Sequence, residues 1–522
     1  MKLPIGIQSF EKLISGAYTY VDKTHYIAEL VKSGMVYFLS RPRRFGKSLF
    51  VDTMDCAFSG RRELFKGLYL DTPESGWDWS KTNPVLRVDW SMSPVRTPEE
   101  LHQRIDELLT DWQKTWNIQV TEKSVGGRTT SLVKEIHRTT GRTVVFLVDE
   151  YDKPILDTLE DPETAKAMRD ILKDFYSALK PIDAHLRFIF LTGVSKFSKT
   201  GIFSGLNNPE DITLTRNCSA ICGYTQDELE RDFKDYLASF DKDQVREWYN
   251  GYRWTGEAVY NPFDILLLFK HGEFRAHWFE TGTPTFLVKL WKGTPRNPAE
   301  YDGLVAGEDL IGSFEIDNLS PITLLFQSGY LTIRSHISNS DIGTRYTLAY
   351  PNREVRQALS RLLLLELVSE KEHSLSRTDQ VRQALTEGNV DSLKGHLVSF
   401  LSSIPYDWFR KNPISKYEGY WASVIYTLMA GTGLVVIPED TTNKGRIDLT
   451  VKTKQGIWIF EFKVKGMDKR GCESPLAQLR EKGYAQKYAG SIGADGKALL
   501  IREIGIVFDA AARNFEQWEV GE

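Results

Sequence analysis

The chain has 522 residues, 41% of them hydrophobic and 12% aromatic, so it can fill several packed cores and is not expected to be disordered. At roughly 150 residues per domain, this length predicts about three domains. The net charge of −4 excludes a global basic field of the kind that marks many nucleic-acid binders, so any such surface must be local.

Targeting signals and disulfide patterns are missing from the sequence. The cysteines Cys56, Cys218, Cys222 and Cys472 form no C-x-x-C pair. The N-terminal segment has no continuous apolar core of the signal-peptide type, and no stretch approaches the roughly 18 apolar residues of a membrane span. We therefore expect a cytoplasmic protein with no membrane partner, and the sequence leaves a homo-oligomer open.

The first informative stretch is SRPRRFGKSL, residues 40–49, which ends like a phosphate-binding loop. An apolar, β-branched run precedes it and a segment with helical apolar spacing follows, which is the strand, loop, helix context that such a loop requires. Backbone N–H groups at the helix start, including that of Gly46, would face phosphate. Lys47 would reach the outer phosphates and Ser48 would bind Mg²⁺.

The loop departs from the usual pattern because Arg41 stands where glycine is expected. A non-glycine residue there does not easily take a positive φ, so the loop must bend differently at its start. We expect Arg41, Arg43 and Arg44 to bring three guanidinium groups near the anion. The alternative is a basic turn capped by Ser48.

A second strand, TVVFLVDEYDKP (143–154), ends in two adjacent carboxylates. In P-loop ATPases the first acid, here Asp149, holds Mg²⁺, and the second, here Glu150, polarises the attacking water. A surface turn is the alternative, but the apolar run before the acids favours a central parallel strand. In a further strand, RFIFLTGVSK, Thr192 either senses the γ-phosphate of ATP or merely ends the strand.

These strands alternate with helices expected near 97–118 and 129–139, which predicts an α/β three-layer P-loop NTPase domain over residues 1–223. TYVDKTHYIAELV, SRPRRFGKSL, VFLVDEYDKP and LTGVSKFSKTGIFSGLNNPEDITL resemble the bacterial and archaeal AAA-ATPase-like family. In that family R-P-R-R-F-G-K-S is the usual form of the loop. The resemblance implies phosphate and metal contacts for Gly46, Lys47 and Ser48, and roles toward Mg²⁺ and water for Asp149 and Glu150.

The middle segment, 224–384, is expected to be mostly helical. Thr225 and Glu228 have the spacing of a capping box at a helix start. The strands expected near SGYLTIRS and TRYTLAYPN could form a winged-helix hairpin, and a basic winged helix can bind DNA. Because the segment lacks a concentrated Lys/Arg stripe, a helical lid and spacer is the favoured interpretation.

The last segment, 385–522, predicts an α-β-β-β-α-β domain of the restriction-endonuclease type. Asp448 lies on one strand, and Glu461 and Lys463 lie on the same face of the next. The two acids are hard ligands for Mg²⁺ or Mn²⁺, and the lysine can activate water or stabilise the transition state. Glu418, at the start of a helix, is a further candidate metal contact. A surface ion-pair pattern is the alternative.

E-G-Y-W, G-R-I-D-L, E-F-K and A-Q-L-R-E-K-G-Y-A-Q-K-Y resemble the PD-(D/E)XK nuclease domain that often follows the AAA-ATPase-like domain. The proline–aspartate of that name is replaced by Gly445-Arg446-Ile447 before Asp448. We therefore expect an ATP- and Mg²⁺-dependent ATPase fused to a Mg²⁺- or Mn²⁺-dependent nuclease, with DNA as the expected nucleic acid. The competing hypothesis is an ATP-dependent switch whose C-terminal module binds nucleic acid or protein without cleaving.

Overall fold

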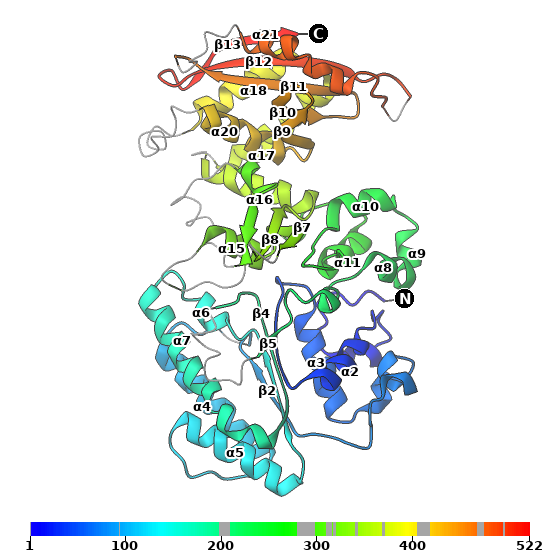
Figure 1. Cartoon of the computed structure of the whole chain (residues 1–522), viewed down its shortest axis with the longest axis vertical. Helices are drawn as coiled ribbons and strands as arrows, with labels where there is room; N and C mark the ends of the chain where they lie inside the picture. Colours follow the sequence, from blue (N-terminus) through cyan, green and yellow to red (C-terminus); the bar gives the residue numbers. More distant parts are fainter. Residues whose placement is uncertain are drawn as a thin grey trace. The chain divides into compact units, whose positions relative to one another are not determined.

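The computed structural model describes residues 2–92, 94–197, 209–278, 298–308, 316, 320–339, 343–367, 371–404, 418–466, 474–493 and 496–521. The chain forms two compact units (Figure 1). Unit 1 comprises Met1–Leu287 with Val305–Asn352, and unit 2 comprises Val288–Leu304 with Arg353–Glu522. The three-domain boundaries stay a prediction. Within the described ranges, no helix has the length and apolarity needed to cross a membrane.

Unit 1 contains a five-stranded parallel sheet in the order β2-β3-β4-β1-β5. All six residues of β3 are buried, as expected for a strand covered on both faces. The strands are β1 (Val36–Ser40), β2 (Val85–Asp89), β3 (Val144–Asp149), β4 (Leu186–Gly193) and β5 (Glu210–Asp211). The surrounding helices are α1 (Phe10–Ser15), α2 (Thr24–Ser33), α3 (Lys47–Phe58), α4 (Pro98–Thr115), α5 (Val125–Thr140), α6 (Lys153–Leu156) and α7 (Pro162–Ser177).

Helices cover both faces of this sheet. Helix α3 packs on one face, where the rings of Phe50 and Phe190 lie 5.8 Å apart. Helices α4 and α7 pack on the other, where Phe146 meets Trp112 at 5.8 Å and Phe175 at 6.2 Å. In Figure 1, α2 and α3 lie on one side of the strands, and α4 to α7 lie on the other. The predicted three-layer α/β domain is confirmed.

The rest of unit 1 is mainly helical, as predicted, and ends in a small antiparallel sheet of order β6-β8-β7. The capping box of Thr225 and Glu228 is confirmed at the start of α8. The predicted hairpin is β7 followed by β8. The elements are α8 (Gln226–Asp232), α9 (Lys234–Leu237), α10 (Lys242–Tyr249), α11 (Pro262–His271), β6 (Val305–Gly307), α15 (Pro321–Gln327), β7 (Thr332–Asn339) and β8 (Gly343–Ala349).

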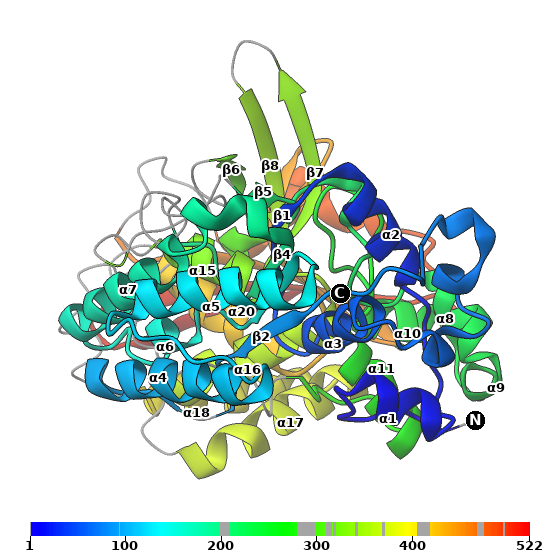
Figure 2. The ribbon, with the colours of Figure 1, turned by 90° about the horizontal axis from the view of Figure 1, so that it is seen from below.

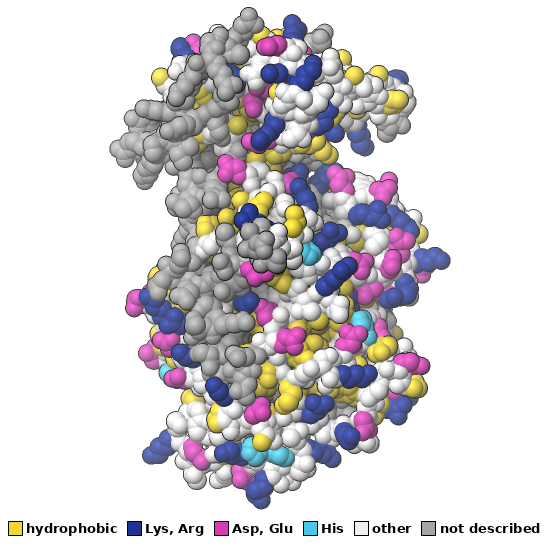
Figure 3. Space-filling view, in the orientation of Figure 1, with side chains coloured by type: hydrophobic (Ala, Val, Ile, Leu, Met, Phe, Trp, Pro, Cys, Tyr) yellow, Lys and Arg dark blue, Asp and Glu magenta, His cyan; other side chains and the backbone are white. Residues whose placement is uncertain are grey.

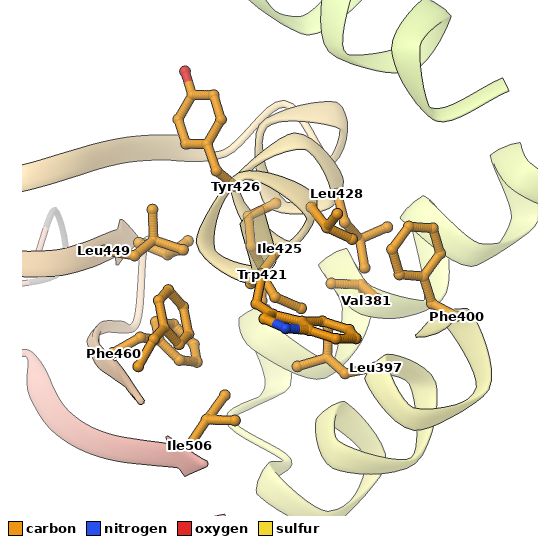
Figure 4. Packing of buried hydrophobic residues seen from close by; sticks show 14 of the residues in the cluster. Val381, Leu397, Phe400, Trp421, Ile425, Tyr426, Leu428, Leu449, Phe460 and Ile506 are labelled. Carbon is orange, nitrogen blue, oxygen red and sulfur yellow. The ribbon is translucent and has the colours of Figure 1, made fainter. Parts of the chain in front are cut away.

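Unit 2 holds a mixed five-stranded sheet in the order β13-β12-β11-β10-β9, in which only β11 and β12 run parallel among the described pairs. Trp421 of α20 stacks on Phe508 of β12 at 5.0 Å. Figure 4 shows Trp421 and Ile425 between the strand residues Leu449 and Phe460 and the helical residues Leu397 and Phe400. The elements are α16 (Arg353–Leu367), α17 (Lys371–Glu387), α18 (Val390–Ser402), α20 (Glu418–Gly431), β9 (Val435–Thr442), β10 (Gly445–Lys452), β11 (Gly456–Val464), α21 (Pro475–Lys482), β12 (Leu500–Asp509) and β13 (Asn514–Gly521).

The predicted α-β-β-β-α-β order is present, with one local difference. Two strands, KALLIRE and IGIVFD, were expected after the second helix, but β12 runs through both as one strand, and β13 follows. Gly505 interrupts the apolar pattern without ending the strand. It permits close packing of α21, because a Cβ there would lie 2.6 Å from the backbone N of Leu476.

Candidate functional sites

The phosphate-binding motif and the paired acids meet at one edge of the unit 1 sheet. Strands β1, β3 and β4 are parallel neighbours, so their carboxyl ends lie side by side. The Leu39–Thr192 and Ser40–Gly193 pairs set the loop that follows β1 next to the end of β4. This arrangement brings Lys47, Asp149, Glu150 and Thr192 to the same edge of the sheet.

The loop reaches α3 through two left-handed residues, Arg44 with φ of 70° and Gly46 with φ of 95°. Helix α3 begins at Lys47, so its first N–H groups lie at the loop. The Lys47 side chain is buried, and its Nζ donates to the carbonyls of Arg41 at 2.9 Å and Pro42 at 3.0 Å. The ammonium is thereby held within the curve of the loop.

The structure corrects the expected position of one arginine. Arg41 is fully buried, and its guanidinium donates to the carbonyls of Ser40 (2.8 Å), Thr213 (3.0 Å) and Cys218 (2.9 Å). It also lies 3.7 Å from the centroid of the Trp254 ring. Arg41 therefore ties the start of the loop to the protein interior and does not serve as an anion contact.

The other loop residues line a cavity of about 400 Å³. Arg43 is half-buried and Arg44 is exposed, with its guanidinium 4.7 Å from the Phe263 ring centroid. The charged and polar part of the wall includes Arg43, Arg44, Gly46, Lys47, Ser48 and Glu150. The apolar part includes Ile7, Leu13, Val21, Phe263 and Leu266. The cavity wall thus combines cationic and apolar side chains.

Asp149 and Thr192 are fully buried and are not part of that wall. The Thr192 hydroxyl donates to Asp149 Oδ1 at 2.7 Å, while Asp149 Oδ2 is buried and has no hydrogen-bond partner among the residues that the structure describes. Such an oxygen is costly to bury unless it binds something. A hard cation held between this carboxylate and the Ser48 hydroxyl fits the donor set.

Glu150 follows Asp149 with a positive φ of 53°, which is unusual for a residue other than glycine. Its side chain lines the cavity. Burial raises the pKa of the Glu150 carboxyl above its ordinary value, against the opposing charge of Lys47. A carboxylate with a raised pKa facing a cationic cavity is suited to accept a proton.

Two further side chains at this site were not assigned from the sequence. Asp152 is buried and accepts from the backbone N–H of Ser195 at 2.6 Å and from its hydroxyl at 2.5 Å, so it joins the end of β3 to the end of β4. Lys23 lines the cavity and forms a 2.6 Å ion pair with Glu228. Both lie in quoted motifs, D-E-Y-D and V-D-K-T, whose extra charged residues were the available signal.

The acids of unit 2 also converge. Leu449 of β10 pairs in register with Phe460 of β11, and the acids Asp448 and Glu461 come next on their strands, at the same end of this pair. Asp448 Oδ2 also accepts a hydrogen bond from the Phe462 backbone N–H at 2.7 Å. Glu461 is buried, and Lys463 Nζ lies 3.9 Å from its Oε1. These contacts place the Glu461 carboxylate near the Lys463 ammonium and tie the Asp448 carboxylate to the same strand, β11.

Helix α21 and the turn after it complete this site. The Gln478 amide donates to Glu461 Oε1. Burial and the charges of Glu461 and Asp448 raise the pKa of Tyr484, while Lys463 opposes the shift. Glu418 is the first residue of α20, but its side chain lies outside the described residues.

Asp440 on β9 is a further buried acid in the same sheet, but its oxygens are engaged. They accept from the Thr450 hydroxyl at 2.9 Å, from the Tyr488 hydroxyl and from Lys487 Nζ. Burial alone would raise the pKa of Asp440, but these hydrogen bonds outweigh it and lower the pKa. We therefore interpret Asp440 as a structural carboxylate and not as a metal ligand.

Across the described ranges, no three His, Cys, Asp or Glu side chains gather as a metal cage. That does not conflict with magnesium, which is commonly held by one or two carboxylates and completed by substrate phosphates and water. Asp448 and Glu461 supply such a pair of hard oxygen donors.

Comparisons with known proteins give the families of two segments of the chain. Residues 4–203 match a family model described as predicted AAA-ATPase, and residues 416–518 match the PD-(D/E)XK nuclease superfamily. An uncharacterized protein from the vnfD 5′ region of Azotobacter chroococcum mcd 1 is 46% identical over 488 residues, which are 93% of each chain. Among solved structures, the Aeropyrum pernix ORC1 protein in complex with DNA aligns with 65% of this chain and 91% of its own, at 14% identity and a TM-score of 0.23.

Proposed function

This chain belongs to the AAA-ATPase-like family and carries a PD-(D/E)XK nuclease superfamily domain, and from that premise we propose that it hydrolyses ATP and cleaves nucleic acid, with DNA as substrate. The observation that carries the proposal is the presence of two separate carboxylate sites, each with a lysine. The nuclease is proposed to depend on Mg²⁺ or Mn²⁺, and ATP to gate or position it.

The cavity of unit 1 supports ATP as its ligand. Its wall includes the cationic Arg43, Arg44 and Lys47, which suit phosphates, and the apolar Val21 and Phe263, which suit the base. We propose that Ser48 and Asp149 hold Mg²⁺ and that Glu150 accepts the proton of the attacking water. The hydrogen bond from Thr192 supports a positioning role, since it fixes the Asp149 carboxylate.

The convergence of Asp448, Glu461 and Lys463 supports phosphodiester cleavage. A bound divalent cation, at either site, supplies Lewis-acid stabilisation of phosphate charge and activates water. The two carboxylates would hold it in unit 2, with Glu418 as a proposed additional contact. Lys463, whose side chain is 22% exposed, can reach a developing negative charge on the scissile phosphate.

Cleavage assays test the nuclease. Purified protein is incubated with linear, circular and single-stranded DNA and with Mg²⁺ or Mn²⁺, in the presence and absence of ATP. Lys463→Ala is expected to lower cleavage about 10²–10³-fold. Lys465→Ala, two residues further along the chain than Lys463, is the matched control, since its exposed ammonium pairs with Glu516.

Cleavage by the wild type and the control, lost in Lys463→Ala, supports the nuclease, and a response to ATP supports gating. No cleavage under any condition, with ATP hydrolysis intact, contradicts the nuclease and favours the regulatory switch that binds without cutting.

A further inference from the structure

The β7–β8 hairpin of unit 1 extends away from the packed helices and the parallel sheet. Its first two residues are buried, and the six that follow, from Arg334 to Asn339, are all exposed. In Figure 2 the two strands project beyond the neighbouring elements of unit 1. Strand β6 covers only the Arg345–Thr347 part of β8, on the edge away from β7. The exposed residues of β7 contribute little to a core, so this strand is available for binding.

The helix before the hairpin does not offer a comparable surface. All residues of α15 after its first are buried, from Ile322 to Gln327. If this small sheet and helix bind a partner, the hairpin makes the contact. The binding mode therefore differs from that of a helix-turn-helix, in which a helix enters the groove.

The base of the hairpin is held firmly. The backbone N–H of Arg253 donates to the Thr332 hydroxyl at 2.6 Å, and that of Ile333 donates to the Arg253 carbonyl at 3.2 Å. The Gln327 side chain accepts from the Lys196 backbone N–H at 2.9 Å. The ribbon is thus anchored at one end, which reduces the entropy lost when it binds.

The exposed part combines positive charge with one large apolar side chain. Ile337 is 72% exposed, and it pairs in register with the exposed Arg345, so both lie on one face. Arg334 and His336 are exposed on the same strand. The described residues of β7 and β8 include no Asp or Glu. On the face drawn in Figure 3, basic and acidic side chains are interspersed.

We infer that the β7–β8 hairpin binds double-stranded DNA, with Arg345 at a phosphate and Ile337 in a groove. Antiparallel strands can enter a DNA groove, and DNA-binding proteins insert apolar side chains such as isoleucine between base steps. The positive hairpin complements the phosphate backbone. This inference rests on the proposed function, since it names where that substrate is held.

Fluorescence anisotropy of the full chain with EDTA, on a labelled duplex and on one of its strands, measures binding without cleavage. Arg345→Ala is expected to weaken duplex binding about three- to tenfold. It should also reduce the salt slope, which is the slope of log affinity against log salt concentration, by about one. Ile337→Ser is expected to weaken duplex binding with the salt slope unchanged. Arg138→Ala, which removes a 72% exposed arginine from α5, is the matched control and should leave both unchanged.

Equal affinity of the hairpin variants and the control for duplex overturns the inference. An equal loss on duplex and single strand also overturns it, because a groove is then not what is recognised. Because no metal is present, an inactive nuclease leaves the measurement intact. Conversely, if the wild type cleaves DNA and the hairpin variants bind duplex as the wild type does, only the DNA-binding role of the hairpin is contradicted, and the proposed nuclease stands.

Discussion

The proposed nucleotide site and the proposed nuclease site use similar groups but are built differently. In unit 1, Lys47 is 5% exposed and Asp149 and Thr192 are fully buried, and each is hydrogen-bonded to the loop or to its neighbour. In unit 2, Glu461 is buried, but the Lys463 side chain is 22% exposed and 3.9 Å away. The lysine of the first site is thus buried, whereas that of the second is partly exposed to solvent. Substitutions should therefore affect folding in the first and mainly activity in the second.

Substitution of Glu150 should have the largest effect on activity. Glu150 belongs to the proposed nucleotide site but, unlike Asp149, lines the cavity, so its loss should affect activity and not folding. Glu150→Gln is expected to lower ATP hydrolysis about 10²–10⁴-fold, because the amide does not accept a proton from water. ATP affinity and thermal stability should change little. Steady-state phosphate release and nucleotide binding measure the two effects separately.

The control is Glu163→Gln on α7, which changes the same charge at a side chain that is 87% exposed. Hydrolysis in Glu150→Gln equal to that of this control contradicts the proposed role of Glu150. A large loss of stability would instead place Glu150 with the buried groups of its site.

Arg41 tests whether the buried groups of unit 1 contribute to its stability. Arg41→Lys removes a planar guanidinium that serves three backbone carbonyls and stacks near Trp254, and a lysine does not satisfy all of them. We expect the free energy of unfolding of unit 1 to fall by about 2–4 kcal/mol. Chemical denaturation followed by tryptophan fluorescence measures the change.

Arg44→Lys is the matched substitution in the same loop, at an exposed arginine near Phe263. It should change stability by less than about 1 kcal/mol. Equal stability of the two variants contradicts the interpretation of Arg41 as a buried tie.

The sequence predicted the elements of unit 1 because their signals are local. The strand, loop and helix around Lys47 have the expected apolar periods, and the acids of β3 follow an unbroken buried run. The prediction that the Arg41 side chain points toward the anion was wrong. Its partners, the carbonyls of Thr213 and Cys218, lie more than 170 residues further along the chain. Sequence spacing carries no information on such contacts.

In unit 2 the sequence predicted the acids and the lysine but divided β12 into two strands at a glycine-containing stretch. A glycine is needed at position 505 because α21 packs closely against the strand there. No local sequence pattern distinguishes such a glycine from one in a turn. The contact of Gln478 with Glu461 is of the same kind. It follows from how α21 packs on the sheet, so only the structure assigns it.

The Gln478 variant should have the smallest effect. It tests whether the unit 2 site also depends on a side chain that positions one of its carboxylates. Gln478→Ala removes the amide that donates to Glu461 and leaves the two carboxylates and Lys463 in place. We expect Mn²⁺ affinity to fall about 10–100-fold, since groups that orient metal ligands contribute that much. Mn²⁺ titration by calorimetry measures the affinity, and cleavage at saturating Mn²⁺ should largely recover.

Gln486→Ala, at an exposed glutamine shortly after α21, is the matched control and should leave Mn²⁺ affinity unchanged. Recovery of cleavage at high Mn²⁺ separates a positioning role from damage to the fold, which excess metal would not repair. If Gln478→Ala binds Mn²⁺ like the control, Glu461 is held by the strand register alone. The nuclease site would then be still less organised by side-chain contacts than the nucleotide site, where Thr192 fixes Asp149.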